Sequence, residues 1–127
     1  MEVAGKAKVL VVDDEQTIAN SLSWILEKEG YETRAAYSGE EAVEVAQAFA
    51  PGVLICDFFM QGMTGLEAAM HLRNQHPFCK VLLVTGHISI AELSQQAAAK
   101  GYDFDYLAKP VNPRVLLDLL RKLLRNP

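Results

Sequence analysis

Short apolar runs alternate along the chain with segments of helical spacing. Residues 9–12 (VLVV) and 53–56 (VLIC) are continuous runs of β-branched and aliphatic residues, which are typical of strands that a parallel sheet buries on both faces. Residues 80–85 and 104–108 have a similar character, and residues 31–36 give a weaker pattern. The pattern therefore predicts five short strands.

The segments between these strands carry apolar residues at the spacing of an amphipathic helix. In residues 18–26 the apolar positions fall at i, i+4, i+7 and i+8, and Gly30 follows where helices commonly end. Three more helices are predicted to begin at capping boxes, in which a Ser or Thr is followed three residues later by Glu: Ser38 and Glu41, Thr64 and Glu67, and Ser89 and Glu92.

The last segment gives the clearest helix. Asn112 suits the N-cap position and Pro113 suits the first turn. An apolar stripe follows, formed by Leu116, Leu119, Leu120, Leu123 and Leu124. Strand and helix thus alternate five times, which predicts an α/β fold in which a five-stranded parallel sheet lies between two layers of helices. Because no linker or repeat interrupts the pattern, we expect a single domain over residues 1–127.

Composition narrows the class of function. The 127 residues have a formal net charge of −4 and the twelve Lys and Arg residues are scattered, so we expect no direct nucleic-acid binding. No apolar run approaches the roughly 18 residues of a membrane span, and the start lacks a signal-peptide apolar region, which predicts a cytoplasmic protein without a membrane partner. Cys56 and Cys79 lack C-x-x-C spacing and are interpreted as small buried hydrophobes.

Chemically active side chains follow the predicted strands. Asp13 and Asp14 follow the first strand, Asp57 the third, Thr85 the fourth and Lys109 the fifth, and ligands of open α/β sheets bind at these carboxyl ends. Neighbouring carboxylates raise each other's pKa values and need a compensating charge. Mg²⁺ prefers such oxygen ligands together with phosphate oxygens. The set therefore favours phosphoryl transfer, with an aspartate as nucleophile.

Four segments resemble the response regulator receiver domains of two-component signalling, of the kind found in chemotaxis regulators. They are residues 9–15 (VLVVDDE), 53–65 (VLICDFFMQGMTG), 81–86 (VLLVTG) and 105–110 (DYLAKP). The resemblance covers essentially the whole chain. It implies a three-layer flavodoxin-like (βα)5 fold whose strands lie in the order 2-1-3-4-5.

The resemblance also implies a role for each residue of the site. Asp57 would accept a phosphoryl group from a sensor histidine kinase or a phosphotransfer protein, while Thr85 and Lys109 contact that group. Tyr106 would be the switch aromatic whose ring turns inward as Thr85 moves. The implied ligands of Mg²⁺ are Asp13, Asp14, Asp57 and the backbone carbonyl of Phe59.

A receiver of this kind is a switched binding module rather than a turnover enzyme, since it catalyses only its own phosphorylation and dephosphorylation. It would signal by contacting a downstream effector protein or domain, or by forming a homodimer through residues 89–100 and 104–124. If the chain is a whole protein, output must be by protein contact; if it is a piece, an effector has been removed.

The chain departs from the family pattern at several positions. Gln61 stands where a Pro is common, and residues 101–105 are one residue longer than the usual spacing. Phe59 and His87 lie two residues beyond the predicted phosphoacceptor and the strand-end Thr, where the family modulates access of the hydrolytic water. We expect Phe59 to slow dephosphorylation. Trp24 is expected to pack against a neighbouring helix, with contact to a partner as the alternative.

Three other classes of function differ from a switched receiver in features that the sequence or a simple experiment can test. A hydrolase of the aspartyl-phosphate type resembles D-x-D-x-[TV], and Phe59 stands where the second acid belongs. A flavodoxin-like cofactor carrier is disfavoured because the loop after the first strand is acidic rather than rich in Gly or hydroxyl groups. A receiver acting as a constitutive scaffold would differ in having no Mg²⁺-dependent response.

Overall fold

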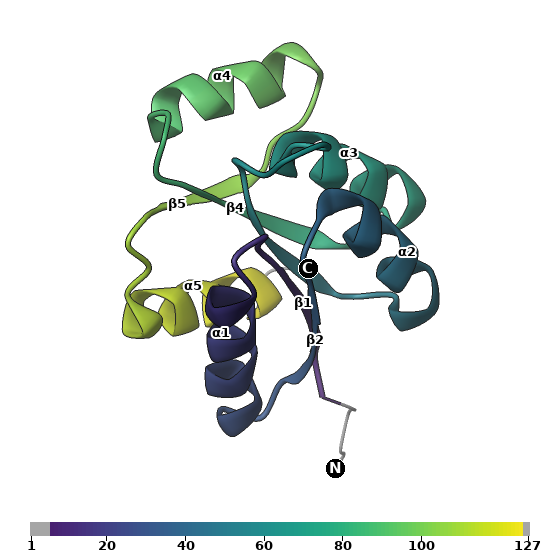
Figure 1. Ribbon diagram of the computed structural model, residues 1–127, viewed down its shortest axis with the longest axis vertical. Coiled ribbons are helices and arrows are strands. Elements are labelled where there is room, and N and C mark those ends of the chain that lie inside the picture. The colour runs from purple at the N-terminus through teal and green to yellow at the C-terminus, as the bar shows by residue number, and fades with distance from the viewer. Residues whose placement is uncertain (1–5, 126–127) are drawn as a thin grey trace.

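The computed structural model describes residues 6–125, where strand and helix alternate as predicted (Figure 1). The strands are β1 (Lys8–Val12), β2 (Glu32–Ala36), β3 (Val53–Asp57), β4 (Lys80–Thr85) and β5 (Asp105–Ala108). The helices are α1 (Gln16–Lys28), α2 (Gly39–Phe49), α3 (Gly65–Gln75), α4 (Ile90–Ala99) and α5 (Pro113–Arg125). All strand pairs are parallel and the sheet order is β2-β1-β3-β4-β5. The predicted fold class and strand order are confirmed.

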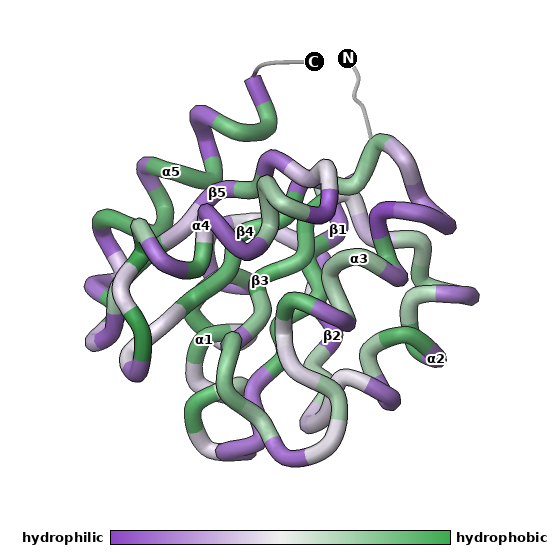
Figure 2. Tube along the Cα trace, turned by 90° about the horizontal axis from the view of Figure 1, so that it is seen from above, coloured by the Kyte–Doolittle hydropathy of each residue, from purple (hydrophilic) through white to green (hydrophobic). Residues whose placement is uncertain are grey.

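The sheet separates two hydrophobic cores because alternate strand residues point to opposite faces. In β1, Val9 and Val11 pack with α1 and α5, whereas Leu10 and Val12 pack with α2, α3 and α4. Figure 1 shows this division, and Figure 2 shows the apolar strands β3 and β4 running through the middle of the molecule. Each buried aliphatic side chain contributes about 1.5–3 kcal/mol by leaving water.

Some local predictions need correction. Phe104 was predicted to begin the last strand, but β5 starts at Asp105 and the buried Phe104 ring stacks on Tyr102 instead. Trp24 does not pack against a helix, because 59% of its surface is exposed and the Lys28 ammonium lies over its ring. On α5, which forms as predicted, Leu116 and Leu120 of the leucine stripe are buried, whereas Leu124 is exposed. Cys56 and Cys79 are buried, as predicted.

The capping boxes differ from one another. The box at Thr64 is complete, because the Glu67 carboxylate accepts a hydrogen bond from the Thr64 amide and the Thr64 hydroxyl accepts one from the Glu67 amide. Ser38 and Ser89 cap α2 and α4 with their hydroxyl groups. Their return bonds are missing in the described residues, and Glu41 accepts from the Tyr37 amide instead. These two boxes are therefore half formed.

Gly65 fixes the geometry at the end of β3. A Cβ atom on Gly65 would overlap the Asp57 carbonyl oxygen and lie 2.8 Å from the Phe58 Cα. The Gly65 amide donates a hydrogen bond of 2.8 Å to the Phe58 carbonyl oxygen. The first turn of α3 can therefore approach the end of β3 this closely only because residue 65 has no side chain.

We predict that Gly65→Ala destabilises the protein by roughly 1–3 kcal/mol, because backbone atoms must move to admit the methyl group. Chemical denaturation measures the change. Gly52→Ala is the matched control, since a Cβ atom there would make an ordinary contact of 3.7 Å with the Lys8 carbonyl oxygen. Equal stability of the two variants would contradict this account of Gly65.

Candidate functional site

The parallel register brings the ends of four strands to one edge of the sheet. Val12 pairs with Cys56, so the acids that follow β1 lie beside Asp57 at the end of β3. On the other side, Thr85 pairs with Ala108 and its carbonyl oxygen accepts a hydrogen bond of 2.9 Å from the Lys109 amide. The sheet therefore gathers residues that are far apart in the sequence.

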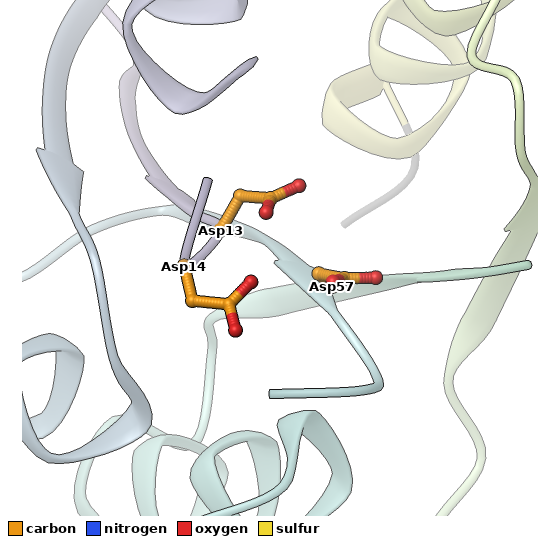
Figure 3. Close-up of side chains that lie close together, drawn as sticks. All are labelled: Asp13, Asp14 and Asp57. Carbon is orange, nitrogen blue, oxygen red and sulfur yellow. The ribbon is translucent and has the colours of Figure 1, made fainter. Parts of the chain in front are cut away.

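Asp13, Asp14 and Asp57 form an acidic cluster at this edge (Figure 3). Each contributes a carboxylate oxygen, and these oxygens all lie within 4.8 Å of one another. Asp13 and Asp57 are buried, with exposed fractions of 4% and 5%, whereas Asp14 is exposed. Because buried carboxylates are costly unless they are paired or bind a metal, this cluster needs positive charge.

Lys109 supplies part of that charge. Its Nζ lies 3.4 Å from Asp13 Oδ2 and 3.3 Å from Asp57 Oδ1. Burial opposes the charged form of Lys109, but the two carboxylates outweigh it and raise the pKa of the amine above its ordinary value. Within the described residues, three ionised carboxylates and one ammonium therefore leave a net charge of −2 at this cluster.

The pKa of Asp57 reflects its burial and the charges around it. Burial raises this pKa above its ordinary value; Lys109 lowers it, and Asp13 and Asp14 raise it further. Since the folded protein holds this proton more tightly than the unfolded chain does, ionised Asp57 destabilises the fold at neutral pH. The penalty shrinks as the pH falls through the raised folded-state pKa, and it is fully relieved only below the pKa of Asp57 in the unfolded chain.

The arrangement fits a hard divalent cation. Asp57 Oδ1 is buried and, within the described residues, accepts no well-directed hydrogen bond despite its ion pair with Lys109. A set made only of carboxylate oxygens is the kind that Mg²⁺ prefers. Asp13, Asp14 and Asp57 can therefore hold such an ion, and it would neutralise the remaining charge.

Two contacts of the site were not anticipated from the sequence. The Glu15 amide donates a hydrogen bond of 2.9 Å to Asp13 Oδ1, which orients this carboxylate at the start of α1. The buried Thr85 hydroxyl donates a hydrogen bond of 2.8 Å to the Ile88 carbonyl oxygen and is held to the loop before α4. Both depend on loop conformations, although an Asp two residues before a helix N-cap, here Glu15, is a recognisable signal for the first.

Aromatic side chains surround this edge. The Phe59 ring is 57% exposed and lies against the His87 ring, with 4.5 Å between centroids and 30° between planes. This pair joins the loop after β3 to the loop after β4. Tyr106 lies on β5 opposite Leu83, half-buried against the core shared by α2, α3 and α4.

An apolar groove of about 720 Å³ opens beside Lys109. The residues that line it come from one face of α1, the loop after β4 and the segment joining β5 to α5; they include Ile18, Leu22, Ile25, His87, Lys109 and Val111. Its position next to the acidic cluster makes it accessible to a partner that also reaches the site. Within residues 6–125, the structure contains no helix of the length and apolar character that a membrane span needs.

Comparison with known proteins gives a consistent result. The family model of the response regulator receiver domain matches residues 9–121. The chain is 31% identical over 119 residues to the alkaline phosphatase synthesis transcriptional regulatory protein PhoP of Bacillus subtilis, a match that covers 94% of this chain and 49% of PhoP. The chain thus spans about half the length of this curated relative.

Solved structures with the same architecture cover nearly the whole chain. The chemotaxis protein CheY4 of Vibrio cholerae is 36% identical, with a TM-score of 0.85 and coverage of 94% of this chain and 99% of that one. A CheY-like receiver domain protein of Methanospirillum hungatei is 33% identical, with a TM-score of 0.86 and coverage of 95% and 96%. The receiver domain of NtrX from Brucella abortus is 30% identical, with a TM-score of 0.81 and coverage of 94% and 99%.

We predict that Mg²⁺ raises the thermal stability of this protein, because an ion that binds only the folded state stabilises it by about 2.7 kcal/mol at 100 times its dissociation constant. Asp14→Asn should reduce the shift in melting temperature at a fixed Mg²⁺ concentration. Asp103→Asn, which removes an exposed acid outside the cluster, should retain it. Identical shifts in both variants would count against metal binding by the cluster.

Proposed function

The chain belongs to the response regulator receiver domain family, and we propose that it is a signalling domain switched by phosphorylation of Asp57. Residues 1–127 would form a single receiver domain, whose first five and last two residues lie outside the described part of the structure. The observation that carries the proposal is the buried Asp57 carboxylate, which shares one edge of the sheet with two acids and one ammonium.

The proposed reaction transfers a phosphoryl group from a phosphohistidine of a sensor histidine kinase or phosphotransfer protein. An Asp57 carboxylate oxygen forms a bond to phosphorus while the bond between phosphorus and the histidine nitrogen breaks, and that nitrogen keeps the electron pair. The products are an aspartyl phosphate and a free imidazole. The protein modifies only itself, so it is not an enzyme that turns over a metabolite.

The surrounding residues have distinct tasks in this proposal. Asp13, Asp14, Asp57 and the backbone carbonyl of Phe59 would hold Mg²⁺. When bound, the metal offsets negative charge on the transferred phosphoryl group. Lys109 lies 3.3 Å from Asp57 and offers its ammonium to the phosphoryl oxygens. Asp13 keeps Lys109 beside Asp57 through their own ion pair.

Thr85 and Tyr106 would form the switch. To bind a phosphoryl oxygen, the Thr85 hydroxyl must leave the Ile88 carbonyl oxygen to which it now donates. This frees the loop before α4, and Tyr106 on the adjacent strand can respond by moving further into the core. The surface formed by α4, β5 and α5 would transmit the change to an effector or form a homodimer. Its exposed apolar residues Ile90, Val115 and Leu124 support an interaction there.

The groove beside Lys109 suits the phosphate donor. Its apolar lining on α1 matches the apolar face of an amphipathic helix, and a helix lying there could present a phosphohistidine to Asp57. We propose this groove as the contact surface for a helical histidine kinase or phosphotransfer domain.

We predict that incubation with acetyl phosphate and Mg²⁺ adds one phosphoryl group, which intact mass spectrometry detects. Asp57→Asn should abolish the gain in mass, because its amide cannot act as the nucleophile. Asp103→Asn should keep the gain, since that residue lies outside the acidic cluster. The proposed function fails if the wild-type protein gains no mass with Mg²⁺, or if the gain persists in Asp57→Asn.

We predict that Phe59→Asn shortens the lifetime of the aspartyl phosphate. The Phe59 ring, held against His87, would restrict the approach of water from the loop after β3. The measurement is loss of phosphate over time after the donor is removed. Phe78→Asn is the control, because this equally large and 93% exposed side chain precedes β4 at the opposite end of the strands. A Phe59→Asn lifetime equal to that of the control would refute the shielding role.

A further inference from the structure

The loop between β3 and α3, residues 58–64, is held by hydrogen bonds of the backbone at its two ends. The Phe58 amide donates a hydrogen bond of 2.8 Å to the Val84 carbonyl oxygen, and Thr64 begins the capping box of α3. Between them, Gln61 and Gly62 are exposed, and Gly62 has a φ of 76° that favours glycine. This loop carries the Phe59 carbonyl, so its conformation decides whether that carbonyl can reach a metal ion.

The first turn of α2 contacts this loop from outside. The Met63 amide donates a hydrogen bond of 3.2 Å to Glu40 Oε2, a contact between residues 23 positions apart. The same oxygen lies 2.9 Å from the position that a Cβ atom on Gly62 would occupy. Met63 also packs so closely on Gly39 that a Cβ atom on that glycine would lie 2.9 Å from the Met63 Cβ. Helix and loop therefore fit each other closely.

Glu40 is available for this contact because its neighbours perform the capping of α2. The Ser38 hydroxyl accepts a hydrogen bond from the Glu41 amide, and the Glu41 carboxylate accepts one from the Tyr37 amide. Glu40 also lies at the positive end of the helix dipole, where an acidic side chain is favourable. Its carboxylate is thus left to bind an amide outside its own helix.

We propose that Glu40 is a positioning residue for the metal-binding loop: its hydrogen bond to the Met63 amide holds residues 58–64 where the Phe59 carbonyl can bind Mg²⁺. The inference rests on the proposed function, because it assumes that Mg²⁺ binds at Asp57. Glu40 acts through Met63 and Gly62 and is not itself a metal ligand. Such outer contacts tune metal affinity by orienting the groups that bind directly.

The experiment compares Glu40→Ala, Glu40→Gln and the control Glu44→Ala. Glu44→Ala removes the same charge from an exposed position one turn further along α2. Glu40→Gln removes the charge but keeps an oxygen that can accept from the Met63 amide. Two quantities are measured in each protein: the Mg²⁺ dissociation constant by calorimetry, and hydrogen exchange of the Met63 amide without metal. Denaturation confirms that every variant is folded.

We expect Glu40→Ala to weaken Mg²⁺ binding about threefold to tenfold, because the bond to the Met63 amide is exposed and its loss should cost about as much as that of an ordinary hydrogen bond. Its Met63 amide should exchange faster. Glu40→Gln and Glu44→Ala should stay within about twofold of the wild type in both measurements.

Three results would overturn the proposal. One is equal Mg²⁺ affinity in Glu40→Ala and Glu44→Ala. Another is a loss in Glu40→Gln as large as in Glu40→Ala, which would assign the effect to charge alone. The third is unchanged exchange of the Met63 amide in Glu40→Ala. If the wild-type protein binds no Mg²⁺, the proposed function itself is wrong. This result is distinguishable from a failure of the Glu40 proposal, because it is seen in the wild-type protein alone.

Discussion

The repulsion among three carboxylates at one edge of the sheet is the interaction on which the rest of the site depends. The fold forces it, because parallel register places the ends of β1 and β3 side by side. Lys109 contacts Asp13 and Asp57 and relieves part of the repulsion. Because burial and the neighbouring acids still raise the pKa of Asp57, the site favours any process that brings further positive charge. Metal binding at this cluster would therefore be linked to the protein's stability through the same residues.

Short-range patterns in the sequence predicted the strands, the helices and the residues at the strand ends, whereas the strand order that brings Asp13 and Asp14 beside Asp57 came from the resemblance to receiver domains. Continuous apolar runs marked β1, β3 and β4, and the residue after each run identified which side chains would meet at the sheet edge. The return bonds of the capping boxes at Ser38 and Ser89 were predicted wrongly. At Ser38, the half-buried Glu41 carboxylate accepts a hydrogen bond from the Tyr37 amide instead. At Ser89, only the bond from the Glu92 amide to the Ser89 hydroxyl forms in the described residues. Sequence spacing alone does not distinguish these outcomes.

Contacts between loops were not predictable in this way. The bonds from Thr85 to Ile88 and from Met63 to Glu40 depend on loop conformations and on how α2 lies against the loop after β3. The prediction for Trp24 was wrong for a different reason. Its apolar character suggested packing against a helix, but α1 turns it to solvent, where its ring is covered in part by Lys28. Hydrophobicity alone does not separate a core residue from a residue of an interaction surface.

The bond from Thr85 to Ile88 gives the proposed switch a physical basis. Lys109 is already shared between Asp13 and Asp57, so a phosphoryl group on Asp57 would bring oxygens that need another donor. Thr85 can donate to a phosphoryl oxygen only by giving up its hydrogen bond to the Ile88 carbonyl oxygen. A neutral hydrogen bond of about 1 kcal/mol is then replaced by a hydrogen bond to a charged group of about 1.5–3 kcal/mol. The difference is small, as a reversible two-state switch requires. Because the bond that is lost holds the loop before α4, the chemistry at Asp57 and the conformation of that loop would be coupled by a single hydroxyl group.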